Sequence, residues 1–130
     1  MSEEINISVN AKIRNGPDIS FSVPQKIGAY DKLDFEVVKG ETKTIQLLPT
    51  GATSVQFLLI KSSQYDKKIS YKVNGAGTKI ILDTPQCFIG VGSMAALVAT
   101  NVPETIEFKN ALTEDDAITI QILVGRDPPT

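Results

Sequence analysis

The chain has 130 residues, 42% of them hydrophobic and 22% charged, with a formal net charge of −2. This composition is typical of one globular domain, and we expect a single domain over residues 1–130 with short flexible tails at 1–3 and 126–130. The slightly acidic balance lacks the basic surface that nucleic acids attract. No apolar stretch reaches the ~20 residues that span a bilayer. We therefore expect neither a nucleic-acid nor a membrane partner.

The chain has no histidine and one cysteine, Cys87. These counts exclude Ser-His-Asp and Cys-His catalytic arrangements within the chain, and they exclude a closed tetrahedral zinc site. A single thiol forms no intrachain disulfide, so we interpret Cys87 as a small hydrophobic residue buried in a strand. We expect no catalytic residues, no bound metal and no cofactor.

The N-terminal region predicts a β-hairpin. Apolar residues occupy every second position of a half-buried strand over residues 4–14, namely Ile5, Ile7, Val9, Ala11 and Ile13. Asn15-Gly16-Pro17-Asp18 is a turn sequence. A second strand follows with Ile19, Phe21 and Val23, and we expect Pro24 to end it.

The middle of the chain predicts further short strands around residues 33–37, 44–48 and 54–62. Residues 57–60 are apolar at consecutive positions, which indicates a strand covered on both faces. Strands at 69–73 and 79–83 flank Asn74-Gly75-Ala76-Gly77, the strongest short-range hairpin signal in the chain. Residues 86–91 predict another strand, and 95–100 predict either a strand or, around 94–97, a helical turn.

The C-terminal region predicts a strand over 104–110, an acidic turn at Thr113–Asp116 and a last strand over 117–125. In that last strand we expect Ile118, Ile120 and Ile122 to face the core. The total is about nine or ten short strands with little or no helix, which predicts an all-β antiparallel β-sandwich. The pattern does not separate a jelly-roll-like from an immunoglobulin-like arrangement.

Two groups of residues suggest ligand binding. Glu114, Asp115 and Asp116 are adjacent carboxylates, but calcium needs about six to eight oxygen ligands, so we favour a solvated turn. Tyr30, Tyr65 and Tyr71 are possible sugar-stacking residues in a chain without tryptophan, and we favour packing roles for them. A carbohydrate-binding β-sandwich module stays open as the alternative function.

The acidic turn Thr113–Asp116, the terminal strand Ala117–Gly125 and the exit Arg126-Asp127-Pro128 resemble small accessory proteins of bacteriophage virions, such as head decoration or cement proteins and tail components. The resemblance implies a homo-oligomer, often a trimer, bound to other virion proteins such as the major capsid protein. The first residues, Met1–Ile5, lack the basic and apolar regions of a signal peptide. We therefore expect a non-enzymatic structural protein that is made in the host cytoplasm and located in the virion.

Overall fold

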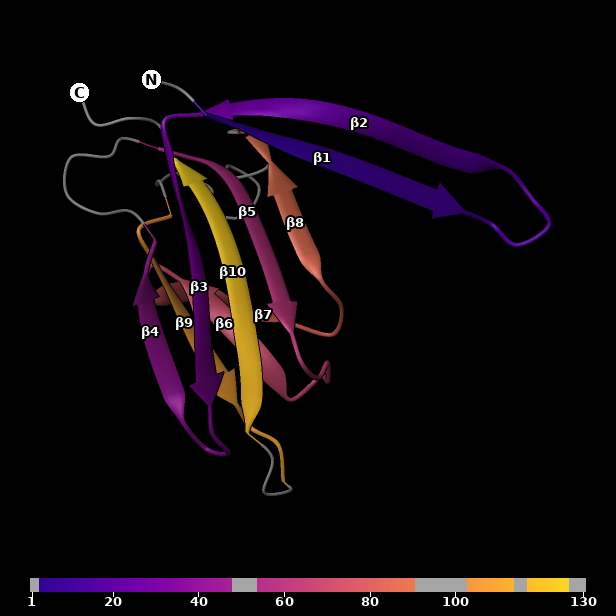
Figure 1. Ribbon diagram of the computed structural model, residues 1–130. Coiled ribbons are helices and arrows are strands. Elements are labelled where there is room, and N and C mark those ends of the chain that lie inside the picture. Colours follow the sequence, from indigo (N-terminus) through magenta and orange to yellow (C-terminus); the bar gives the residue numbers. More distant parts are fainter. Residues whose placement is uncertain (1–2, 48–53, 91–102, 114–116, 127–130) are drawn as a thin grey trace.

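The computed structural model describes residues 3–47, 54–90, 103–113 and 117–126 (Figure 1). These residues form ten strands: β1 (Glu3–Lys12), β2 (Asp18–Ile27), β3 (Ala29–Val37), β4 (Thr42–Gln46), β5 (Val55–Ser62), β6 (Ile69–Val73), β7 (Ala76–Ile81), β8 (Gln86–Ile89), β9 (Thr105–Asn110) and β10 (Ile118–Arg126). All the strand pairs are antiparallel. The predicted all-β antiparallel fold is confirmed.

Strands β3 to β10 form a sandwich of two four-stranded sheets, in the orders β3-β10-β5-β8 and β4-β9-β6-β7. The pairs are nested: β3 pairs with β10, β4 with β9, β5 with β8 and β6 with β7. The chain is therefore a long antiparallel ribbon that doubles back on itself and wraps into two layers. This strand order is that of a jelly roll and differs from the immunoglobulin order.

The core lies between the two sheets. Ile118, Ile120 and Ile122 of β10 are buried there, as predicted, and they join one core cluster with Tyr71 of β6 and Phe108 of β9. The rings of Tyr71 and Phe108 are tilted against each other with centroids 5.5 Å apart. Burial of each of the three isoleucine side chains stabilises the fold by roughly 1.5–3 kcal/mol.

Two buried polar side chains join the sheets to each other. Asn110, at the end of β9, donates from Nδ2 to the carbonyl of Val37 in β3 at 3.0 Å. Arg126, at the end of β10, donates from Nε to the carbonyl of Leu47, just after β4, at 2.6 Å. The Arg126 side chain also donates to Asp31 Oδ2 at 2.7 Å. A buried charge is tolerated only when it is paired in this way.

A third polar contact between the sheets involves Tyr71 of β6, whose hydroxyl donates to Oε1 of Gln86 in β8. Gln86 in turn donates from Nε2 to the carbonyl of Ile81 at 2.9 Å. Burial raises the pKa of the Tyr71 phenol above its usual value. Together with the contacts of Asn110 and Arg126, this network fixes how the two layers lie on each other.

The structure differs from the sequence-based expectation in the N-terminal hairpin and at the C-terminus. Strand β2 does not end at Pro24 but continues to Ile27, with Pro24 opposite Asn6. A two-stranded ribbon has free edges on both sides, and proline, which has no amide donor, is accepted on an edge. Glu3 and Arg126, both expected in flexible tails, lie in strands instead: Glu3 begins β1 and Arg126 ends β10, where it is only 6% exposed.

The predicted hairpin at Asn74-Gly75 is confirmed as a two-residue turn between β6 and β7. Both residues have positive φ, 59° and 69°, as a type I′ turn requires. Asn74 Oδ1 also accepts from the amide of Glu104 at 2.7 Å, which attaches the turn to the start of β9. The predicted element at 95–100 lies outside the described residues.

Ile120→Lys tests the register of β10. Ile120 is buried in the core and Thr119, its neighbour on the opposite face, is exposed. An unpaired buried charge costs several kcal/mol, so we expect Ile120→Lys to yield no soluble folded protein. Thr119→Lys, the matched control, is expected to melt within a few degrees of the wild type by circular dichroism. Equal melting of the two variants would contradict the register.

Tyr71→Phe tests the buried phenol. Unfolded tyrosine loses its proton near pH 10, about the usual value, whereas folded Tyr71 keeps it to higher pH. The stabilising contribution of Tyr71 is therefore fully present below about pH 10 and falls as the pH rises further. We expect the free energy of unfolding of Tyr71→Phe to be about 1 kcal/mol lower than that of the wild type at neutral pH. As the pH rises above about 10, this free energy is expected to fall less in Tyr71→Phe than in Tyr30→Phe, which keeps Tyr71. Urea unfolding at a series of pH values measures these free energies. An equal fall with pH in Tyr71→Phe and Tyr30→Phe would contradict the burial of the Tyr71 phenol.

Candidate interaction surface

Strands β1 and β2 form a separate two-stranded sheet that projects from one end of the sandwich (Figure 1). We call this hairpin, Glu3–Ile27, the arm. Its ladder of ten residue pairs runs from Glu3 opposite Ile27 to Lys12 opposite Asp18, a length of roughly 34 Å at about 3.4 Å per residue. At its tip the amide of Ile13 donates to the carbonyl of Pro17 at 3.0 Å. The predicted hairpin is confirmed.

The arm has one apolar and one polar face, because residues opposite each other in an antiparallel pair share a face. The apolar face consists of Ile5, Ile7, Val9 and Ala11 from β1 with Ile19, Phe21, Val23, Gln25 and Ile27 from β2. The polar face consists of Glu4, Asn6, Ser8, Asn10 and Lys12 from β1 with Asp18, Ser20, Ser22, Pro24 and Lys26 from β2. The ribbon is therefore amphipathic from the pair Glu4–Lys26 to the pair Lys12–Asp18.

The apolar face is buried at its base and exposed towards its tip. Ile27 and Ile7 are 3% and 8% exposed, whereas Ile19 is 73% exposed. Among the described residues, four of the six exposed large hydrophobic side chains lie on the arm: Val9, Ile13, Ile19 and Phe21. The expectation that the strand over residues 4–14 is half-buried is therefore wrong for its outer part, where Val9 and Ile13 are exposed. A two-stranded ribbon is marginally stable alone, and exposed apolar patches mark interaction sites.

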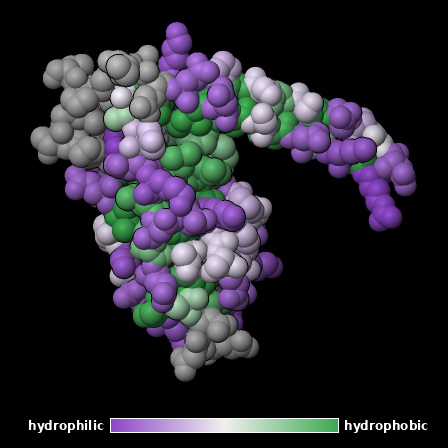
Figure 2. Space-filling model, in the orientation of Figure 1, coloured by the Kyte–Doolittle hydropathy of each residue, from purple (hydrophilic) through white to green (hydrophobic). Residues whose placement is uncertain are grey.

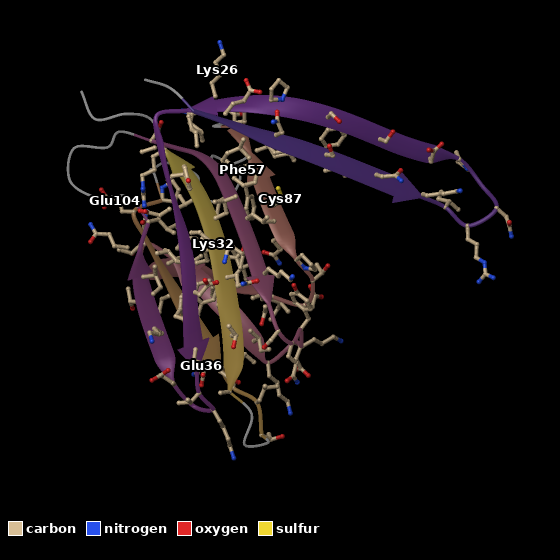
Figure 3. The ribbon with its side chains drawn as sticks, in the orientation of Figure 1. Lys26, Lys32, Glu36, Phe57, Cys87 and Glu104 are labelled. Atoms are coloured by element: carbon tan, nitrogen blue, oxygen red, sulfur yellow. The ribbon has the colours of Figure 1, made fainter. Side chains whose placement is uncertain are left out.

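A glycine positions the base of the arm. Gly125 of β10 has no side chain, and a Cβ built there would lie 2.8 Å from Ile27 Cγ2 and 3.1 Å from Ile5 Cδ1. Phe57 of β5 lies opposite Gly125 on the same face of the sheet and is only 2% exposed. Figure 3 shows Phe57 where the arm leaves the sandwich. The amide of Gly28, between β2 and β3, donates to the Arg126 carbonyl at 2.7 Å.

A second apolar surface lies beside the base of the arm, on the outer face of the sheet β3-β10-β5-β8. Leu123, Leu59 and Cys87 lie opposite one another across β10, β5 and β8, and Ile89 lies opposite Phe57. We call Leu59, Cys87, Ile89 and Leu123 the sheet corner. Cys87 is exposed and the other three are half-buried. Figure 2 shows hydrophobic surface where the arm joins the body and on the body beneath it.

The sheet corner ends at a polar row, in which Asp34, Gln121 and Lys61 lie opposite one another. The ammonium group of Lys32 lies 3.1 Å from Asp34 Oδ2. Hydrogen bonds from Lys32 and then from Gln121 lower the pKa of the Asp34 carboxyl group. The outer face of this sheet thus changes from apolar beside the arm to charged further along β3 and β10.

The structure separates the residues that the sequence suggested as ligand-binding. Cys87 lies in a strand, as predicted, but its side chain is exposed rather than buried, and its apolar surroundings raise the pKa of the thiol. Tyr30 is exposed at the start of β3, Tyr65 is half-buried and its hydroxyl accepts from the amide of Ser62, and Tyr71 is in the core. The three rings do not form a row. Residues 114–116 of the acidic turn lie outside the described residues.

The polar face of the arm contains a shallow hollow of about 360 Å³, lined by Ser8, Val9, Asn10, Asp18, Ser20, Phe21 and Ser22. The hydroxyl oxygens of Ser8 and Ser22 are 3.2 Å apart there. In the part of the chain that the structure describes, no group of three or more Cys, Asp or Glu side chains is placed to hold a metal ion. The same part contains no helix of the length and hydrophobicity needed to cross a membrane.

Sequence reasoning identified the apolar residues of the hairpin and expected the strand over residues 4–14 to be half-buried, without a projecting arm. The alternation of Ile5 to Ile13 shows which side of the strand is apolar, and it does not show what covers that side. The alternation on both sides of the turn at Asn15-Gly16 indicates a hairpin, and a hairpin packed on the body would have the same pattern. Comparison with known protein families, with curated proteins and with solved structures found no match to this chain.

Gly125→Ala tests the packing at the base of the arm. The added methyl group would overlap Ile27 Cγ2 and Ile5 Cδ1, and overpacking of a filled site costs about 1–3 kcal/mol. Gly16→Ala is the control, because its Cβ would lie 3.0 Å from Cγ2 and 3.2 Å from Cβ of Ile13, a residue that is 63% exposed at the tip of the arm and not packed in a filled site. We expect urea unfolding to show that Gly125→Ala lowers the free energy of unfolding by about 1–3 kcal/mol, and that Gly16→Ala lowers it by less than about 0.5 kcal/mol. Equal stability of the two variants would refute the close packing.

Proposed function

We propose that this protein is a non-enzymatic structural subunit that acts through protein–protein contacts within a larger assembly. The observation that carries the proposal is the arm, which holds Val9, Ile19 and Phe21 in solvent on one face of a projecting ribbon. Exposed apolar side chains of this size, gathered on one face, are typical of interaction surfaces. An extended ribbon also reaches a neighbour that the compact body does not touch.

The body of the molecule supports the same proposal. Its two layers are joined by buried polar contacts of Asn110, Arg126 and Tyr71, which make a rigid base for the arm. The jelly roll occurs in viral capsid proteins, lectins and cupins, so the fold is compatible with an assembly role without requiring it.

Within this class of function, we propose a component of a bacteriophage virion that contacts a major capsid or tail protein and its own copies. The resemblance of the terminal segment, from the acidic turn Thr113–Asp116 to the exit Arg126-Asp127-Pro128, supports this assignment. The jelly-roll architecture, which viral capsid domains also use, adds support of the same general kind.

Replacement of the exposed apolar side chains tests the role of the arm. We expect the wild type to self-associate at micromolar concentrations in light scattering, and the double variant Ile19→Ser, Phe21→Ser to remain monomeric because the apolar contact area is lost. The double variant Ser20→Ala, Ser22→Ala changes the polar face at the same height of the arm and is expected to associate like the wild type.

The thermal midpoints of all three proteins are measured beside the association, because a docking role leaves the fold intact. Two results would reject the proposal that the arm is an assembly surface. One is a wild type that stays monomeric at every concentration. The other is an Ile19→Ser, Phe21→Ser variant that associates as strongly as the wild type.

A further inference from the structure

We propose that the arm docks on a second copy of this chain, and that two copies exchange arms reciprocally. In this arrangement the outer part of each apolar face, around Val9, Ile19 and Phe21, lies on the sheet corner of the other copy. The inference rests on the proposed function and adds the identity of the partner and the surface that receives the arm.

Continuity of the apolar surface is the first argument. The base of the arm already lies on the outer face of its own sheet, over Gly125 and beside Phe57. The sheet corner follows in the next row, with Leu123, Leu59 and Cys87 in line. The arm, however, diverges from the body beyond its base (Figure 1), so its outer side chains do not cover the corner of their own chain.

Each chain therefore presents two apolar surfaces of similar chemistry that the described residues leave partly exposed. A second copy related by a two-fold axis supplies an arm for the corner and a corner for the arm, since such an axis makes every contact twice. The outer apolar face consists of Val9, Ala11, Ile19 and Phe21 and contains no charged residue, and neither does the sheet corner. The exchange thus buries no unpaired charge.

The area to be covered favours a reciprocal over a single contact. Side chains of this size bury roughly 60–120 Å² each when transferred fully from water. The outer arm, with Val9, Ala11, Ile13, Ile19 and Phe21 partly exposed, then supplies on the order of 300 Å². A stable interface buries about 800 Å² per partner. One docked arm falls well short, whereas each protomer of an exchanged pair contributes both an arm and a corner, or about 600 Å². The pair then buries about 1,200 Å² in total, the lower end of the range for stable interfaces.

The shape of the molecule favours a protein partner over a lipid surface. The apolar face is the one that packs on the body at the base of the arm, so it begins on the inner side of the angle between arm and body. A narrow ribbon of two strands fits into that angle, whereas a flat bilayer does not. The tip also carries Lys12, Arg14 and Asp18, whose side chains are exposed.

Disulfide trapping with the single native cysteine tests the exchange. Cys87 lies in the sheet corner and is exposed. Val9→Cys and Ile19→Cys place a second thiol on the apolar face, and Asn10→Cys and Ser20→Cys place it on the polar face at matched heights. Oxidised glutathione accepts the two electrons as the two thiols form one disulfide and leaves as two reduced glutathiones. Because the Cys87 thiol has a raised pKa, the reaction is run at about pH 9.

We expect covalent dimers to form about tenfold faster from the apolar-face variants than from the polar-face variants, because docking raises the local thiol concentration. A mixture of Val9→Cys, Cys87→Ser protein with wild type is expected to give a one-to-one cross-linked pair, which identifies the bond as one between copies. Wild type alone measures the background bond between two Cys87 residues.

Equal cross-linking rates from the two faces would overturn the exchange. A disulfide within one chain, seen as a faster-migrating monomer on a non-reducing gel, would overturn it too, since the arm would then close on its own body. Sedimentation of wild type with phosphatidylcholine vesicles, lost in Ile19→Ser, Phe21→Ser, would assign the apolar face to lipid instead.

The two proposals fail in different ways. If association in light scattering depends on Ile19 and Phe21 but no apolar-face cross-link forms, the assembly role stands and the reciprocal exchange is wrong. If the wild type does not associate at any concentration, the exchange is wrong and so is the proposal that the arm joins copies of this chain.

Discussion

The contacts at the end of β10 are the constraint on which both parts of the molecule depend. Gly125 provides the space that Ile5 and Ile27 occupy, and Arg126 connects the two sheets through the Leu47 carbonyl and Asp31. The Arg126 carbonyl also accepts from the amide of Gly28, where the arm joins the body. Two neighbouring residues of one strand thus hold the base of the arm at the end where the sandwich closes.

The nested pairing of the strands explains why these contacts lie where they do. Strands β3 and β10 are the first and the last strand of the sandwich. Their antiparallel pairing brings together residues as far apart in the sequence as Ala29 and Arg126. Such long-range pairing forms only after a large loss of chain entropy. The arm precedes β3 directly, so it emerges at the end of the sandwich where the chain closes on itself.

The sequence was sufficient for the local features and insufficient for those that depend on distant partners. Alternation in residues 118–124 predicted the buried face of β10, and Asn74-Gly75 predicted its turn, because each depends on residues close in the chain. The choice of the jelly roll depends on nested pairing, which leaves no local pattern. The burial of Arg126 depends on Asp31, 95 residues away. For the arm, periodicity identified the apolar side and gave no information on what lies against it.

The single residue between β2 and β3, Gly28, has a consequence for the geometry of any exchanged assembly. Strand β2 ends at Ile27 and β3 begins at Ala29, so the orientation of the arm relative to the body changes mainly at this one position. In a pair with two-fold symmetry every arm and corner is occupied and growth stops. A different angle at Gly28 would lead each arm to a third molecule, and the same contacts would then propagate as an open filament. Under the proposed exchange, the hydrogen bond from the Gly28 amide to the Arg126 carbonyl, which holds this angle, would favour the closed pair over a filament.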